Sequence, residues 1–124
     1  MKLFRDRRQA AAACNALCAS AGLEPAFAER GLTDAWARDE ACDDGLTPLS
    51  NAQYAAFQFA YGLFQTYETA EDILVADLFE LLAVPAATLR CAGELFVAAS
   101  HGFGAVDAWL AAASVRPPQV SQAP

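Results

Sequence analysis

Basic residues are missing from a long central part of the chain. Between Asp39 and Leu89 there is no Lys, Arg or His, although nine carboxylates fall within the same span. No cation of that span can pair with them, so this part of the chain has a negative field. Such a field repels nucleic acid and anionic lipid, and it favours a cationic partner. We therefore expect neither direct nucleic-acid binding nor binding to a membrane.

Signatures of catalysis and of cofactor binding are also missing. The chain has one histidine, His101, and contains no G-x-S-x-G, no H-E-x-x-H and no Gly-rich phosphate loop. A catalytic thiol needs a base, and only Cys91 lies as close as ten residues to that histidine. A calcium loop fails at Cys42, where an oxygen ligand is needed, and no Glu-x-x-His pair could hold a di-iron centre. We therefore expect no enzyme activity, no metal and no other cofactor.

Cysteine is too scarce for a disulfide scaffold, and the four thiols stand in apolar surroundings. Two of them are four residues apart on one helical face, but no second close pair completes a zinc site. Buried thiols are the favoured interpretation, with a zinc site as the alternative. We expect a reducing cytoplasm, because the basic N-terminal segment and Ala-rich run lack the apolar region of a signal peptide. The four are Cys14, Cys18, Cys42 and Cys91.

Strand patterns are rare as well. Val and Ile are scarce and no stretch alternates with period two, whereas roughly a quarter of the chain is Ala, the strongest helix former. The apolar fraction of 56% suffices for a core in one domain. The sequence predicts an all-α fold: a compact single-domain bundle of five to seven helices over residues 1–114. Residues 115–124, with Arg116-Pro117-Pro118, are predicted to form an extended, mobile tail.

Capping and stop signals divide this domain. Gly22 is expected as the glycine just beyond the first helix, and Thr47-Pro48 is the strongest start signal, a capping hydroxyl before a first-turn proline. The tract from His101 to Gly104 is expected to break the chain. The predicted helical segments are 4–20, a short turn at 25–29, 33–42, 48–67, 69–83, 85–100 and 105–114.

The segment Gly45–Tyr67 is uncharged and aromatic-rich, and we expect it to be the central helix of the bundle. At helical spacing, Phe57, Ala60, Phe64 and Tyr67 share an apolar face. A second ridge is predicted to be the wettest face of the helix or a contact surface for another chain. It consists of Asn51, Tyr54, Gln58, Tyr61 and Gln65.

The acidic residues have two interpretations. Glu71 and Asp72 fall in the first turn of a predicted helix, where negative charge is stabilising. Asp77 and Glu80 fall later, where a carboxylate in the last turn costs about 0.3–1 kcal/mol, and no Lys or Arg at helical spacing compensates them. A basic partner explains their placement, and a generic solubilising surface is the alternative. The basic residues of the first eight positions are expected to pair with the chain's own acidic surface.

These observations predict a protein that binds the basic surface of a nucleic-acid-handling partner and blocks it. In size, charge and expected helicity the chain is similar to small acidic inhibitors, such as phage-encoded anti-defence proteins and toxin-immunity proteins. The resemblance includes no motif, so no site is carried over from it. The predicted partner-binding residues are the carboxylates of Asp39, Glu40, Asp43, Asp44, Asp77 and Glu80, with Tyr54 and Tyr61 as aromatic anchors.

The alternative function is a structural or adaptor subunit. Small Ala side chains on the first and last helices would allow close helix packing between chains, and a homo-oligomer is then possible. Salt separates the two hypotheses, because a steered acidic inhibitor loses its partner at high salt and an apolar assembly does not.

Overall fold

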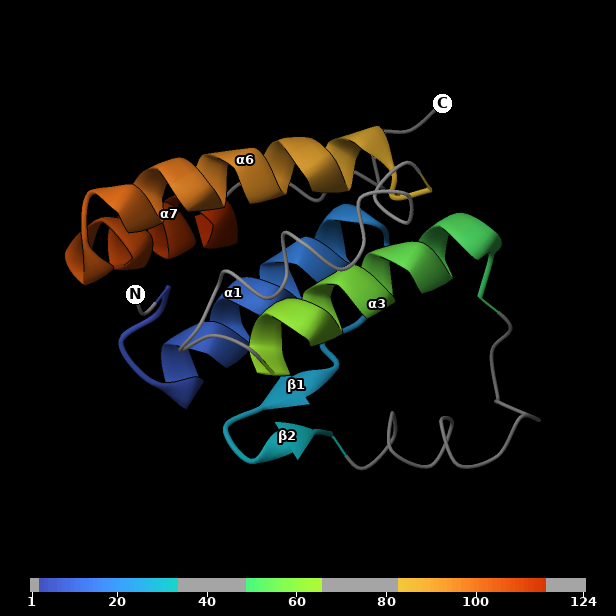
Figure 1. The fold of residues 1–124 in the computed structure, drawn as a ribbon, viewed down its shortest axis with the longest axis horizontal. Coiled ribbons are helices and arrows are strands. Elements are labelled where there is room, and N and C mark those ends of the chain that lie inside the picture. Colours follow the sequence, from blue (N-terminus) through green and yellow to red (C-terminus); the bar gives the residue numbers. More distant parts are fainter. Residues whose placement is uncertain (1–2, 34–48, 66–82, 116–124) are drawn as a thin grey trace.

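The computed structural model describes residues 3–33, 49–65 and 83–115 (Figure 1). These residues form four helices and one two-stranded sheet, so the all-α prediction is confirmed; the predicted count of five to seven helices is not confirmed. The predicted helices at 33–42 and 69–83 lie outside the described residues except at their ends, and so does the tail from residue 116. The elements are α1 (Arg7–Ser20), β1 (Phe27–Ala28), β2 (Gly31–Leu32), α3 (Asn51–Gln65), α6 (Ala86–Ser100) and α7 (Phe103–Val115).

Among the described elements the central helix is α1, and the expectation that the aromatic-rich helix would be central is wrong there. In Figure 1, α1 lies between α3 and the α6–α7 pair, and it contacts α3, α6, α7 and β1. Its small side chains explain this position, because they let neighbouring helices approach on several sides. Ala10, Ala13 and Cys14 are fully buried, whereas α3 buries one face and exposes Gln58 on the other.

The first helix begins later than predicted and ends where predicted. It starts at Arg7, because the Asp6 carboxylate caps it by accepting a hydrogen bond from the backbone N–H of Gln9 at 2.9 Å. At its other end, Gly22 has a φ of +79° and donates to Ala19 O at 3.0 Å. The Leu23 amide donates to Cys18 O at 3.0 Å, which completes a Schellman motif.

The helical turn predicted at 25–29 is wrong, because the chain there forms a small β-hairpin. β1 and β2 pair antiparallel, with Ala28 opposite Gly31. The Asn15 side chain takes the place of a third strand: its Oδ1 accepts from the Ala26 and Phe27 amides, and its Nδ2 donates to Phe27 O, all at 2.9 Å. These bonds attach the hairpin to α1 and satisfy backbone groups that a helix would have satisfied internally.

The uncharged helix α3 also begins later than predicted. Gln53 N donates to the Ser50 hydroxyl at 3.1 Å, and Ser50 N donates to Gln53 Oε1 at 3.2 Å. This reciprocal pair is a capping box, so the helix starts at Asn51, whereas the predicted signal at Thr47-Pro48 lies outside the described residues. Gln53 Nε2 also donates to Ala21 O at 3.2 Å, which joins the start of α3 to the end of α1.

The last two helices follow the prediction closely. Pro85 directly precedes α6, which ends at Ser100, and Gly102 turns the chain with a φ of +112°. The break is shorter than expected, because α7 starts at Phe103. His101 is exposed at the end of α6. No helix in the described ranges is long and apolar enough to cross a membrane.

The core takes one large side chain from each main element. Phe4, Leu17, Leu63, Leu95 and Val106 are each 0% exposed and come from the N-terminal segment, α1, α3, α6 and α7 respectively. Burial of one such side chain stabilises the fold by about 1.5–3 kcal/mol. The described segments are therefore held together by one shared core, which fixes which face of α3 points outward.

Candidate partner-binding surface

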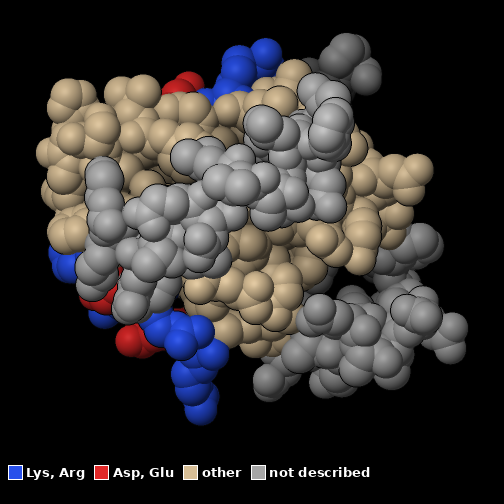
Figure 2. Space-filling view, viewed as in Figure 1, with Lys and Arg blue, Asp and Glu red and all other residues tan. Residues whose placement is uncertain are grey.

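The described residues are electrically neutral although the chain is acidic. They contain five arginines and five carboxylates, whereas the whole chain has a formal net charge of −7. In the view of Figure 2, the surface of the described residues is mostly uncharged, with basic and acidic side chains at its margins. The ten residues are Arg5, Arg7, Arg8, Arg30, Arg90, Asp6, Glu24, Glu29, Glu94 and Asp107.

The acidity is concentrated in two internal segments, residues 34–48 and 66–82. They hold ten of the fifteen carboxylates and a single basic residue, Arg38. The six carboxylates predicted to bind a partner belong to these segments and lie outside the described residues. The first segment leads through Leu49 to the start of α3, and the second follows Gln65 at its end. The two acidic segments are therefore joined to opposite ends of one helix, about 21 Å apart.

The ridge predicted on α3 is the exposed face of that helix. Asn51, Tyr54, Gln58 and Gln65 are exposed, and the Tyr54 side chain keeps 54% of its surface in contact with solvent. The adjoining apolar face, with Phe57, Ala60 and Phe64, is buried as predicted; Tyr67 lies outside the described residues. The sequence therefore predicted correctly which side of this helix faces outward.

The two predicted tyrosine anchors differ in their surroundings. Tyr61 is half-buried, with its ring centroid 5.7 Å from that of Phe57 and 6.1 Å from that of Phe27. Phe27 also stacks on Phe57 at 6.0 Å and contacts Phe64 at 5.1 Å. Tyr61 is thus held at the edge of an aromatic cluster that fastens the hairpin to α3. Tyr54, one turn from the start of the helix, projects more freely.

The arginine side chains of the N-terminal segment pack on aromatic rings. The Arg7 guanidinium lies over the Phe64 ring of α3, 5.3 Å from its centroid, and Arg5 lies 5.9 Å from the Phe103 ring centroid. Such cation–π contacts are worth about 0.5–1 kcal/mol at exposed positions. The aromatic side of α3 therefore already holds one guanidinium group.

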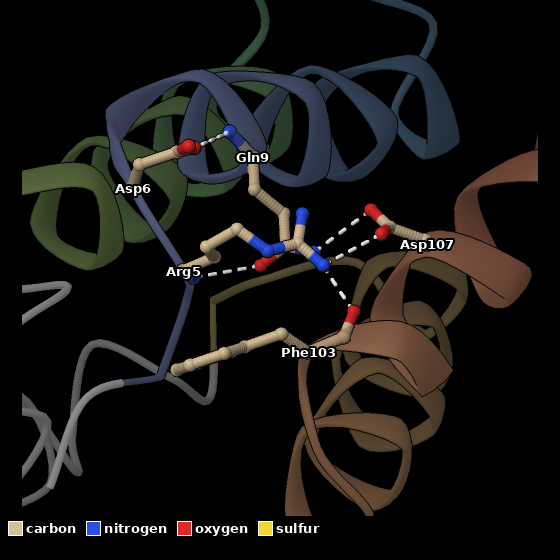
Figure 3. Close-up of polar contacts among 5 residues, drawn as sticks. All are labelled: Arg5, Asp6, Gln9, Phe103 and Asp107. Atoms are coloured by element: carbon tan, nitrogen blue, oxygen red, sulfur yellow. Dashed lines mark hydrogen bonds and ion pairs between the residues drawn. The ribbon is translucent and has the colours of Figure 1, made fainter.

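A polar network joins the N-terminal segment to α7 (Figure 3). The buried Gln9 amide accepts from Arg5 N at 2.7 Å and donates to Phe103 O and Asp107 Oδ1, both at 2.9 Å. Arg5 also pairs with Asp107 Oδ2 at 2.8 Å. Hydrogen bonds from Arg5 and Gln9 lower the pKa of Asp107, and the hydrogen bond to Asp107 raises the pKa of Arg5. The expected pairing of the basic segment with the chain's own acids is thus found at Asp107, a residue that the sequence did not single out.

The described thiols are part of the core or lie beside it. Cys14 and Cys18 are fully buried; burial raises the pKa of Cys14, with the neighbouring Cys18 adding to the effect, and burial raises the pKa of Cys18 to about 12. Cys91 is half-buried, with its sulfur 4.0 Å from Ala16 O. At Cys14 and Cys18 the prediction of buried thiols is confirmed, while Cys42 lies outside the described residues. No group of three metal-binding side chains occurs in the ranges that the structure describes.

The described framework thus provides an exposed amide and tyrosine face, and the remainder of the chain provides the charge. Comparison with known proteins finds no matching family model, no similar curated protein and no similar solved structure. The features that the chain offers to a partner are therefore its distribution of charge and the exposed face of α3.

Proposed function

We propose that this chain is a small acidic helical protein that binds a basic, nucleic-acid-handling partner and inhibits it by occupying its basic surface. In this it would act in the manner of phage anti-defence or immunity proteins, in the cytoplasm and without enzyme activity of its own. The supporting observation is the separation of charge: the described residues are neutral overall, and two acidic segments are joined to the two ends of α3.

Chain length alone keeps part of this charge close to α3. Glu68 comes three residues after Gln65, and Asp44 comes six residues before Ser50. At full extension these separations are at most about 10 Å and about 20 Å. The sequence also places helices at 33–42 and 69–83, which would bring the bundle to the five to seven helices expected. Carboxylates near both ends of one neutral face would attract a basic surface and orient it over that face.

Neutralising the acidic pairs tests this proposal. The variants are Asp77→Asn with Glu80→Gln, and Asp43→Asn with Asp44→Asn. Each should slow association with the captured partner several-fold and reduce its dependence on salt, because steered association depends on the field around the site. The partner is first captured from a lysate of the source cell with tagged protein, released by high salt and identified by mass spectrometry.

A matched control removes the same amount of charge from the described residues. Glu24→Gln with Glu29→Gln neutralises two exposed carboxylates of the described surface, which is neutral overall. This control should retain most of the association rate. Unchanged binding by both acidic-pair variants would show that the electrostatic account is wrong.

An apolar assembly subunit is the second candidate, and one observation favours it. Helix α6 exposes Leu89 and Val97, the latter with 61% of its surface accessible to solvent. On the first helix, which the sequence also suggested as a contact, Ala12 and Ala19 are exposed, although α1 packs against α3, α6 and α7 on its other sides. Recovery of only a second copy of the chain, or of a partner that withstands high salt, would favour this function over inhibition.

A further inference from the structure

The outward side of α3 has a row of side chains that are exposed or, at Tyr61, packed only against the edge of the core. Tyr54, Gln58 and Tyr61 follow one another at steps of four and three residues, so they share one face of the helix. Tyr54 and Gln58 are exposed and Tyr61 is half-buried. Within the described parts of the chain, neither the Tyr54 hydroxyl nor the Gln58 amide has a hydrogen-bond partner. These three residues are named the α3 row.

The same helix shows how an arginine binds to it. Arg7 places its guanidinium over the Phe64 ring with no carboxylate in that contact, at 5.3 Å from the ring centroid. A tyrosine ring offers a similar negative face, and its hydroxyl and a neighbouring amide oxygen can accept N–H groups. The α3 row therefore has the groups needed to receive a second guanidinium, from outside the chain.

Charge favours a cationic occupant of this row over any other. No residue of α3 is charged, so no cation of the helix itself competes for the rings. The acidic segments join the helix at both of its ends and would draw cations towards it. A planar guanidinium stacks on tyrosine and bonds to an amide at the same time, whereas a lysine ammonium is compact and strongly hydrated. The row therefore fits arginine better than lysine.

We infer that the α3 row is the specificity element of the partner site and binds an arginine-rich segment of the basic partner. The Tyr54 ring stacks on a guanidinium, Gln58 Oε1 accepts one of its N–H groups, and Tyr61 closes the far side. This inference rests on the proposed function, because the acidic segments bring the partner to the helix. It adds a preference that charge alone does not produce.

Two synthetic peptides of equal length and charge test the inference with the full chain. One has arginine and the other lysine at every basic position, and fluorescence anisotropy measures their affinities at low and at high salt. The arginine peptide should bind about two- to five-fold more tightly for each ring engaged. Both affinities should fall as salt rises, because the acidic segments contribute to both.

Substitution of Tyr54 locates the preference. Tyr54→Ala should bring the affinity for the arginine peptide down towards that for the lysine peptide and leave the lysine affinity unchanged. Tyr54→Phe keeps the ring and should keep most of the preference. Val97→Ala, which removes exposed apolar surface on α6 instead, is the matched control and should change neither affinity. Circular dichroism confirms that each variant is folded, as expected for exposed positions.

The outcomes separate this inference from the proposed function. Equal, salt-sensitive binding of both peptides would overturn the role of the α3 row and leave the acidic-inhibitor proposal standing. A preference for arginine that survives in Tyr54→Ala would also overturn it. Binding of neither peptide would contradict both proposals.

Discussion

At the scale of single residues, a few polar side chains inside the helical framework decide how the chain folds back on itself. Asn15 is the clearest case, because its amide makes three hydrogen bonds to the backbone of Ala26 and Phe27 from the middle of an Ala-rich helix. An asparagine there is unfavourable for the helix by itself, since it competes for backbone groups. The tertiary contact compensates for that cost.

We therefore expect Asn15→Ala to lower the free energy of unfolding by about 2–4 kcal/mol, because two amide N–H groups and one carbonyl lose their partner. Urea unfolding followed by circular dichroism measures the loss. Asn51→Ala, at an exposed position of α3, is the control and should change stability by about 0.5 kcal/mol or less. Equal effects of the two substitutions would mean that Asn15 does not anchor the hairpin.

At the scale of elements, the helices end at caps that can be predicted from the residue types at those positions. Gly22 ends α1 with a positive φ of +79°, which side-chain-bearing residues rarely adopt. Gly93 lies within α6, where a Cβ would meet no atom within 4 Å. The backbone conformation therefore requires a glycine at position 22, whereas at position 93 a larger residue would fit the helix.

We expect Gly22→Ala to destabilise the protein by about 1–2 kcal/mol, because alanine is strained in the left-handed region. Gly93→Ala should stabilise it by about 0.5–1 kcal/mol, because alanine is the better helix former and space is available. Thermal unfolding of the two variants beside the parent gives both signs in one experiment. Stabilisation by Gly22→Ala would contradict the Schellman end of α1.

At the scale of the whole molecule, the two ends of the described chain are held together. Arg5 and Asp107 are 102 positions apart and form an ion pair, with the buried Gln9 amide bonded to both. The pKa of Asp107 is lowered from its ordinary value of 3.8 by the hydrogen bonds from Arg5 and Gln9. A carboxylate whose pKa is lower in the folded than in the unfolded state stabilises the fold above its ordinary pKa. That contribution is lost as the pH falls through the folded-state pKa.

We therefore expect Asp107→Asn to unfold at a slightly lower temperature than the parent at pH 7. The difference should shrink as the pH falls below the ordinary value of 3.8 and vanish below the lowered folded-state pKa, where the carboxylate of the folded parent is protonated too. Calorimetry between pH 7 and pH 2.5 measures it, with Glu24→Gln as an exposed control. A difference that stays constant over this range would show that the ion pair makes no contribution.

The sequence by itself determined the helical class, the end of α1 at Gly22, the extent of α6 and the outward face of α3. These features depend on local physics: Ala content, capping residues and the 3.6-residue period act within a few positions of the chain. The candidate surface was predictable to the same degree, since the exposure of Tyr54 and Gln58 follows from that period and the charge is a property of composition.

Only the tertiary structure decided the rest. It made α1 the central described helix, turned residues 27–32 into a hairpin, placed Tyr61 in an aromatic cluster and joined Arg5 to Asp107. Each of these features depends on contacts between different elements, whereas local propensity depends only on residues that are close in sequence. The hairpin shows the reason most directly, because its backbone is satisfied by one asparagine amide on another element.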